Sequence, residues 1–104
     1  MNAINMKQLF EKLSRDGFVV ERHEEDNSFR VDGDQYVLSV AFNERNYCSN
    51  RGVDFGWAVE NAEVAIWERN PPYLSVDGPA GGVWAWQSVE QIEHLISQYV
   101  GAPK

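Results

Sequence analysis

The sequence predicts a two-layer α+β domain, in which an antiparallel meander sheet of about five to six strands carries an N-terminal and a C-terminal helix on one face. Apolar residues follow a helical period only near the two chain ends, within residues 5–16 and 88–100. Between these ends the apolar residues alternate and the connections are short, which favours antiparallel neighbours. The 104 residues, of which 43% are hydrophobic, are enough for one domain (residues 1–104) with a single core.

The first helix is expected over residues 5–16. Asn5 is a suitable N-cap, and Gln8 three positions later completes a capping box. Gly17 suits the left-handed position that ends many helices. The apolar face has the spacing of a 3.6-residue period and consists of Met6, Leu9, Phe10 and Leu13.

Three strands are expected next, over residues 18–23, 29–31 and 36–42. A polar run turns the chain between the first two, and Asp32-Gly33 is a hairpin signal before the third. The third strand is the clearest, because alternate side chains share one apolar face: Tyr36, Leu38, Val40 and Phe42. The side chains on its other face are small and uncharged, which leaves room for another segment to lie partly against that face.

The middle of the chain is a polar loop over residues 43–52, followed by an ambiguous segment. In residues 53–59 the apolar side chains alternate as in a strand. Gly56 weakens that strand and leaves a short helical turn as the alternative.

Residues 62–68 are the next expected strand, because they include β-branched and aromatic residues and neither glycine nor proline. Val64 and Ile66 are the expected core pair. Glu63 and Trp67 then lie on the opposite face of this strand.

A shorter strand is expected over residues 73–76, after a proline pair that cannot donate to a sheet ladder. A glycine-rich turn leads to the extended segment 83–86, in which Trp84 and Trp86 are expected to point to the same side.

The second helix is expected to begin after Ser88, with Gln91 completing another capping box, and to end at Gly101. Its apolar stripe consists of Val89, Ile92, Leu95, Ile96 and Tyr99. The two helices therefore carry the same kind of start signal and one apolar face each.

Charge and composition exclude several classes of function. A net charge of −7 and a pI near 4.7 oppose direct nucleic-acid binding, which requires Lys and Arg, and are compatible with a basic protein partner. The alternative interpretation is that the acidity serves solubility. No apolar run is long enough to span a membrane, no signal peptide is present, and the single Cys48 cannot form an internal disulfide, so a cytoplasmic location is expected.

Three groups resemble catalytic or metal sites, but each lacks part of the pattern. Residues 23–26 lack the second histidine of a zinc helix, and residues 32–34 lack the remaining ligands of a calcium loop. We interpret both as solvated hairpin edges. Cys48 with His23 or His94 lacks an oxyanion-hole signature. The sequence therefore predicts no catalytic residue, no metal and no cofactor.

The remaining candidates for a functional surface are acidic and aromatic residues. Residues 21–34 carry six acids and two arginines, and residues 54–68 carry four acids and no base. In one sheet these carboxylates could form a continuous negative surface, although an ordinary acidic strand face is the simpler interpretation. Most of the four tryptophans are expected in the core, with one or two free for a partner. The candidate partner-binding residues are Glu21, Glu24, Glu25, Asp26, Asp32, Asp34, Tyr47, Asp54, Glu60, Glu63 and Trp67.

The run Ala62-Glu63-Val64-Ala65-Ile66-Trp67, then a turn, then Val83-Trp84-Ala85-Trp86 before Ser88, resembles small uncharacterised proteins of phages and mobile elements. This resemblance covers the C-terminal part of the chain and implies a short, acidic, cytoplasmic accessory protein, without identifying functional residues. Anti-CRISPR proteins and nuclease-immunity proteins are similar to the chain in size and charge.

The leading prediction is a non-enzymatic protein-interaction module. In its more specific version, the module is an inhibitor of a basic nucleic-acid-binding protein. One alternative is a small enzyme or ligand-binding domain that uses loop 46–52 with Cys48 or His23. Another is a homodimer formed through the open sheet face or an edge strand.

Overall fold

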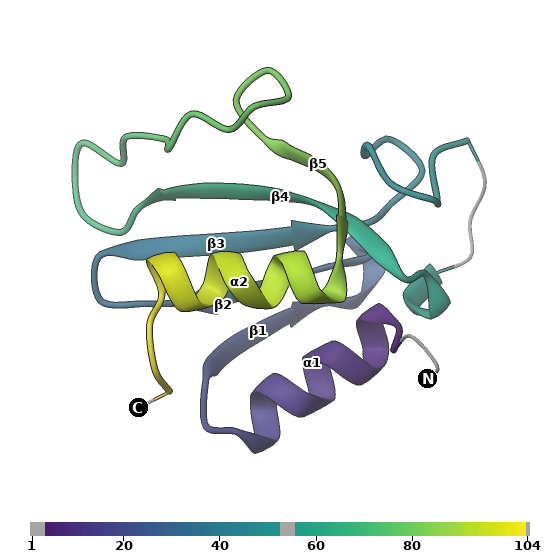
Figure 1. Cartoon of the computed structure of the whole chain (residues 1–104), viewed down its shortest axis with the longest axis horizontal. Coiled ribbons are helices and arrows are strands. Elements are labelled where there is room, and N and C mark those ends of the chain that lie inside the picture. Colours follow the sequence, from purple (N-terminus) through teal and green to yellow (C-terminus); the bar gives the residue numbers. More distant parts are fainter. Residues whose placement is uncertain (1–3, 53–55, 104) are drawn as a thin grey trace.

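The computed structural model describes residues 4–52 and 56–103 and shows a five-stranded antiparallel meander with strand order β1-β2-β3-β4-β5 (Figure 1). The predicted α+β fold is therefore confirmed. The helices and strands are α1 (Met6–Arg15), β1 (Val19–His23), β2 (Ser28–Asp32), β3 (Tyr36–Ala41), β4 (Asn61–Glu68), β5 (Trp84–Ser88) and α2 (Val89–Tyr99). Two short 3₁₀ turns, η1 (Glu24–Asp26) and η2 (Gly56–Ala58), precede β2 and β4.

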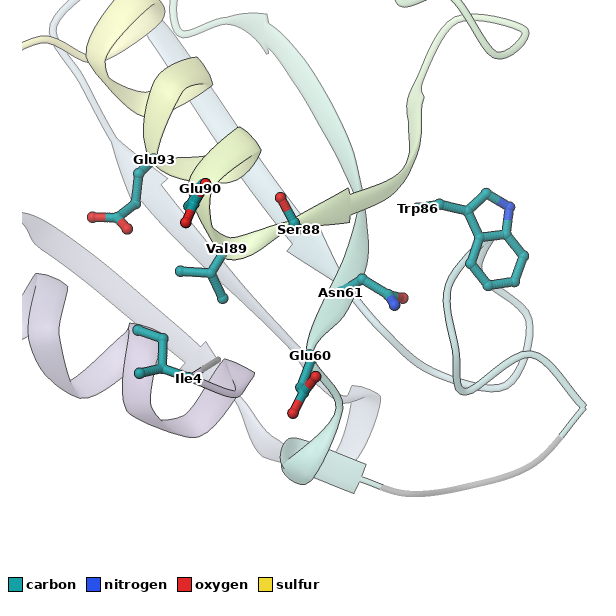
Figure 2. Close-up of a pocket in the computed structure, with 8 residues that line it drawn as sticks. All are labelled: Ile4, Glu60, Asn61, Trp86, Ser88, Val89, Glu90 and Glu93. Carbon is teal, nitrogen blue, oxygen red and sulfur yellow. The ribbon is translucent and has the colours of Figure 1, made fainter. Parts of the chain in front are cut away.

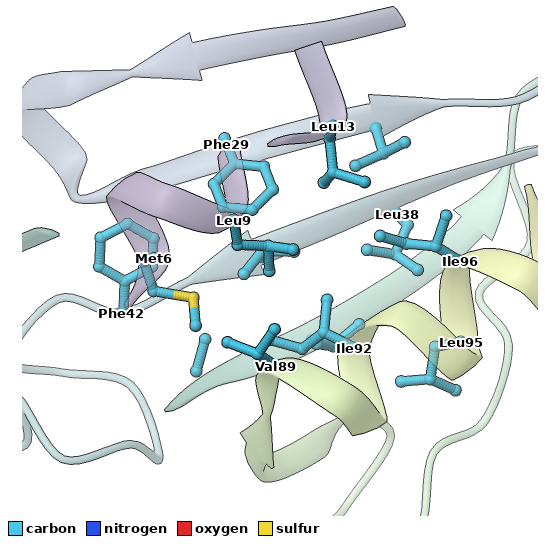
Figure 3. Close-up of a cluster of buried hydrophobic side chains, with 14 of the residues drawn as sticks. Met6, Leu9, Leu13, Phe29, Leu38, Phe42, Val89, Ile92, Leu95 and Ile96 are labelled. Carbon is cyan, nitrogen blue, oxygen red and sulfur yellow. The ribbon is translucent and has the colours of Figure 1, made fainter. Parts of the chain in front are cut away.

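Both helices pack on the same face of the sheet, as predicted (Figures 1 and 3). The register places alternate residues of β2, β3 and β4 opposite one another on this face, where they are fully or almost fully buried. The resulting core contains Phe29, Val31, Leu38, Val40, Val64 and Ile66 from the strands, and Met6, Leu9, Leu13, Ile92 and Ile96 from the helices. Burial of these apolar side chains is the main source of stability for the two-layer arrangement.

The two predicted capping boxes are present. The Asn5 side chain accepts a hydrogen bond from the Gln8 backbone amide, and the Gln8 side chain accepts one from the Asn5 amide, both at 2.9 Å. Ser88 and Gln91 make the same reciprocal pair at the start of α2. Each helix therefore begins where its local sequence specifies.

Residues 56–58 form the 3₁₀ turn η2, so the helical-turn alternative was right for this part of the ambiguous segment. Val53 and Phe55 lie outside the described residues. Trp57 packs edge-on against Phe42, with ring centroids 4.9 Å apart, which gives the turn an aromatic anchor on the core.

The strand predicted over residues 73–76 is wrong. Only Ser75 forms a bridge, to Trp67, and the Leu74 carbonyl accepts from the Glu68 amide. Tyr73 has a φ of 58°, in the left-handed region, so the chain cannot run extended through this residue. The segment therefore touches β4 without extending the sheet.

Trp84 and Trp86 do not share surroundings, contrary to the prediction. Trp84 packs on Tyr99 of α2, with ring centroids 6.1 Å apart. Trp86 is 52% exposed and has a φ of 54°. A register shift between β4 and β5 at Ala62–Val64 interrupts the alternation that the prediction assumed.

No helix of the described residues covers the second face of the sheet. Val37 is nevertheless buried there, directly opposite Trp67, and the Arg30 guanidinium lies 5.6 Å from the Trp67 ring centroid. The loop of residues 43–52 is hydrogen-bonded to the start of β4 on this side. In the described part of the chain, neither helix combines the length and apolarity required to cross a membrane.

Candidate functional site

A groove of about 530 Å³ lies where the N-terminal ends of both helices meet the start of β4 and the end of β5 (Figure 2). Among the described residues, three carboxylates and one indole contribute to its walls, and none of these lining residues is basic. The groove is lined by Ile4, Glu60, Asn61, Trp86, Ser88, Val89, Glu90 and Glu93.

The junction between β5 and α2 builds one wall of this groove. Ser88 ends β5 and caps α2, so the strand passes into the helix without a loop. Glu90 lies in the first turn of α2, and Glu93 follows on the same helix face three positions later. A carboxylate in the first turn also interacts favourably with the positive end of the helix dipole.

The start of α1 builds the other wall. The Met6 amide donates to the Val59 carbonyl at 2.9 Å, which fixes the beginning of α1 beside the segment that leads into β4. This bond places Ile4 and Glu60 in the same groove. Residues far apart in the sequence therefore meet through one backbone hydrogen bond.

Trp86 extends from β5 at one end of the groove, and Glu93 lies at the opposite end (Figure 2). The Trp86 amide donates to the Tyr47 carbonyl at 2.9 Å. A non-glycine residue in the left-handed region costs about 1–2 kcal/mol, and such conformations concentrate at functional sites. An exposed indole held in this conformation is therefore a candidate contact residue.

The three groove carboxylates are not equivalent. Glu93 Oε2 accepts from Lys12 Nζ at 2.8 Å, and this hydrogen bond and charge raise the pKa of Lys12. Within residues 4–52 and 56–103, the side chains of Glu60 and Glu90 have neither a hydrogen bond nor an ion pair. Two negative charges are thus left to interact with a cation from outside.

The arrangement suits a lysine or arginine side chain. Carboxylates attract its charge, and an indole face attracts a cation with about 0.5–2 kcal/mol. The apolar side chains of Ile4 and Val89 can contact the methylene stem of such a side chain. The Ser88 hydroxyl is occupied as the helix cap, since it accepts from the Gln91 amide.

The acidic residues of segment 21–26 do not line this groove, and some of them are paired. Glu24, Glu25 and Asp26 form the exposed turn η1 between β1 and β2. Arg22 pairs with Glu24 at 3.2 Å, and Glu21 lies 3.5 Å from the His23 imidazole.

Asp32, Asp34 and Trp67 lie near the other end of the strands. Asp32 is 3.6 Å from Arg30, which also contacts Trp67, and Asp34 is in the exposed turn before β3. The uncharged strand β3 separates the acids of β1 and β2 from those of β4. The carboxylates therefore form separate groups and not one continuous surface.

Of the candidate partner-binding residues, Glu60 lines the groove. Tyr47 and Glu63 are bonded to each other, because Glu63 Oε2 accepts from the Tyr47 amide at 2.8 Å. Asp54 lies outside the described residues. Sequence reasoning missed Trp86, Glu90 and Glu93 as site residues; the capping box at Ser88 was the available signal, since it fixes the first turn of α2.

The alternative site on loop 46–52 places Cys48 in the interior of the molecule. Cys48 is fully buried, its Sγ lies 3.7 Å from the Asn43 carbonyl, and burial raises the pKa of the thiol. Neither histidine is within hydrogen-bond distance of Cys48 in the described chain. Among the same residues, no group of three His, Cys, Asp or Glu side chains is placed to hold a metal ion.

Comparisons with protein-family models, with curated proteins and with solved structures found no match to this chain.

Proposed function

We propose that this chain is a non-enzymatic protein-interaction module that binds a basic segment of another protein in the groove between α1, β4 and α2. The observation that supports this most is the combination of Glu60 and Glu90, which have no ion-pair or hydrogen-bond partner among the described residues, with the exposed indole of Trp86. A lysine or arginine of the partner would pair with the carboxylates and pack on the indole.

The overall charge supports the same proposal. With a net charge of −7, the chain attracts a basic protein over a distance of about one Debye length, roughly 8 Å at physiological salt. Complementary charge mainly accelerates association, whereas a buried aromatic anchor mainly slows dissociation. The groove supplies both components.

In its more specific version, the proposal is that the chain is a cytoplasmic inhibitor, similar in kind to anti-CRISPR or nuclease-immunity proteins. A nucleic-acid-binding protein presents Lys and Arg side chains to phosphates. Glu60 and Glu90 would occupy such side chains and prevent that contact. The alternative of an enzyme on loop 46–52 has less support, because Cys48 is buried and burial raises the pKa of its thiol.

Binding of a defined probe tests the proposal. The probe is a short peptide in which Lys and Arg alternate with Gly, and the control peptide carries Gln at each basic position. We expect the basic peptide to bind and the control peptide not to bind, with affinity falling as salt rises from about 0.05 to about 0.3 M.

Variants locate the binding. Trp86→Ala should weaken binding of the basic peptide about tenfold, and Glu60→Gln or Glu90→Gln about two- to fivefold each. Glu25→Gln is the matched control, because it removes the same charge from the exposed turn η1 outside the groove. Absence of binding, or an equal loss in Glu25→Gln, would contradict the proposal.

A further inference from the structure

Loop 43–52 is fastened to β4 by side chains of that strand. Glu63 accepts at both oxygens, from the Tyr47 amide at 2.8 Å and from Asn46 Nδ2 at 3.3 Å. Asn61 and Ser49 add a reciprocal pair, with the Ser49 amide donating to Asn61 Oδ1 at 2.7 Å. The middle of the loop is therefore fixed on the strand.

The same loop holds β5. The Tyr47 amide donates a hydrogen bond to Glu63. The Tyr47 carbonyl accepts a hydrogen bond from the Trp86 amide at 2.9 Å. This bond is made where the register between β4 and β5 shifts and where Trp86 adopts a φ of 54°. A hydrogen bond at this amide offsets part of the cost of the left-handed conformation.

We propose that Glu63 is a positioning residue, which acts through Tyr47 to hold the Trp86 indole at the groove. Glu63 fixes the Tyr47 peptide groups, and the Tyr47 carbonyl fixes the Trp86 backbone. Without the Glu63 carboxylate the Tyr47 carbonyl moves, and Trp86 returns to a negative φ that carries the indole away. Glu63 thus contributes without touching the partner; this consequence for binding rests on the proposed function.

The test measures the backbone angle of Trp86 directly. The three-bond coupling constant between the amide proton and Hα of Trp86 depends on φ, so it separates the left-handed from the extended conformation. The variants are Glu63→Ala, Glu63→Gln, which keeps one acceptor oxygen, and the control Glu44→Ala, which removes a charge from an exposed side chain of the same loop. Binding of the alternating basic peptide is measured on each variant.

In Glu63→Ala we expect the Trp86 coupling constant to move to the extended-strand value and the affinity to fall about tenfold, as in Trp86→Ala. Glu63→Gln should retain part of both properties, and Glu44→Ala should match the wild type. If Glu63→Ala fails to fold, the coupling constant and the affinity of Glu63→Gln are compared with those of the wild type.

The two proposals fail in different ways. An unchanged Trp86 coupling constant in both folded Glu63 variants would overturn the positioning role, even where the wild type binds the peptide. A shifted coupling constant in a protein whose wild type does not bind the peptide would support the positioning role and overturn the proposed function.

Discussion

Trp86 combines two properties that local sequence does not favour: an exposed indole and a left-handed backbone. Glycine adopts a positive φ without steric cost, whereas alanine has the same Cβ penalty as tryptophan. We therefore predict that Trp86→Gly is more stable than Trp86→Ala by about 1 kcal/mol.

Urea unfolding of the two variants checks this order. In an ordinary strand position alanine is the more stable residue by about 0.5–1 kcal/mol. A higher free energy of unfolding for Trp86→Ala than for Trp86→Gly would show that residue 86 has a negative φ in solution. It would then remove the structural basis for an indole held at the groove.

Cys48 is the second informative residue, because its thiol is fully buried and burial raises its pKa. The unfolded chain releases this proton at about pH 8.5, before the folded chain does. The unfolded state then binds fewer protons, so the free energy of unfolding falls as pH rises from about 8.5 to the folded pKa.

Chemical denaturation between neutral and alkaline pH, compared with Cys48→Ala, isolates this effect. The wild type should lose more stability with rising pH than the variant, and the native thiol should resist alkylation. Rapid alkylation of the folded wild type near neutral pH would contradict the buried position.

At the scale of elements, the sequence predicted best where the signals are local. The helix starts at Asn5 and Ser88 follow from capping boxes whose atoms are only three residues apart. The side of β4 that faces the core follows from alternation of Val64 and Ile66. The strand at 73–76 failed because its backbone depends on the conformation of Tyr73, which residue type alone does not reveal.

A surface ion pair joins the two helices, Lys12 with Glu93 at 2.8 Å. Their side chains are 42% and 35% exposed, so we predict a coupling of only about 0.2–1 kcal/mol. The pKa of Lys12 is raised by Glu93, so this contribution is complete below the unfolded pKa of about 10.4 and is lost as pH rises through the folded value.

A double-mutant cycle with Lys12→Met and Glu93→Gln measures this coupling at low and high salt. The energy should decrease as salt is added. A coupling well above 1 kcal/mol that does not respond to salt would mean that the pair is desolvated and that the helices depend on it.

At the scale of the whole molecule, the fold was predictable and the site largely was not. Glu60 was a candidate from its acidic surroundings in the sequence. Glu90 and Trp86 join it only because β5 runs directly into α2 and because the start of α1 is bonded to Val59. Such tertiary juxtapositions leave no periodic signal in a single sequence.

The acidity of the chain is likewise organised by the fold. Arg22 and Arg30 lie among the acids of β1 and β2, so the charge on that side of the sheet is partly neutralised. The groove has no base in its lining and keeps Glu60 and Glu90 unpaired within the described residues. The molecule therefore presents two carboxylates in the same groove as its most exposed tryptophan.

The most direct test is a titration of the isotope-labelled protein with the alternating basic peptide, followed by the shifts of its backbone amide and indole signals. Binding in the groove predicts that the Trp86 indole and the amides of residues 60, 61 and 90 move together and saturate. Saturable shifts confined to η1 or to the Arg30–Trp67 face, or no shifts at low salt, would contradict the account.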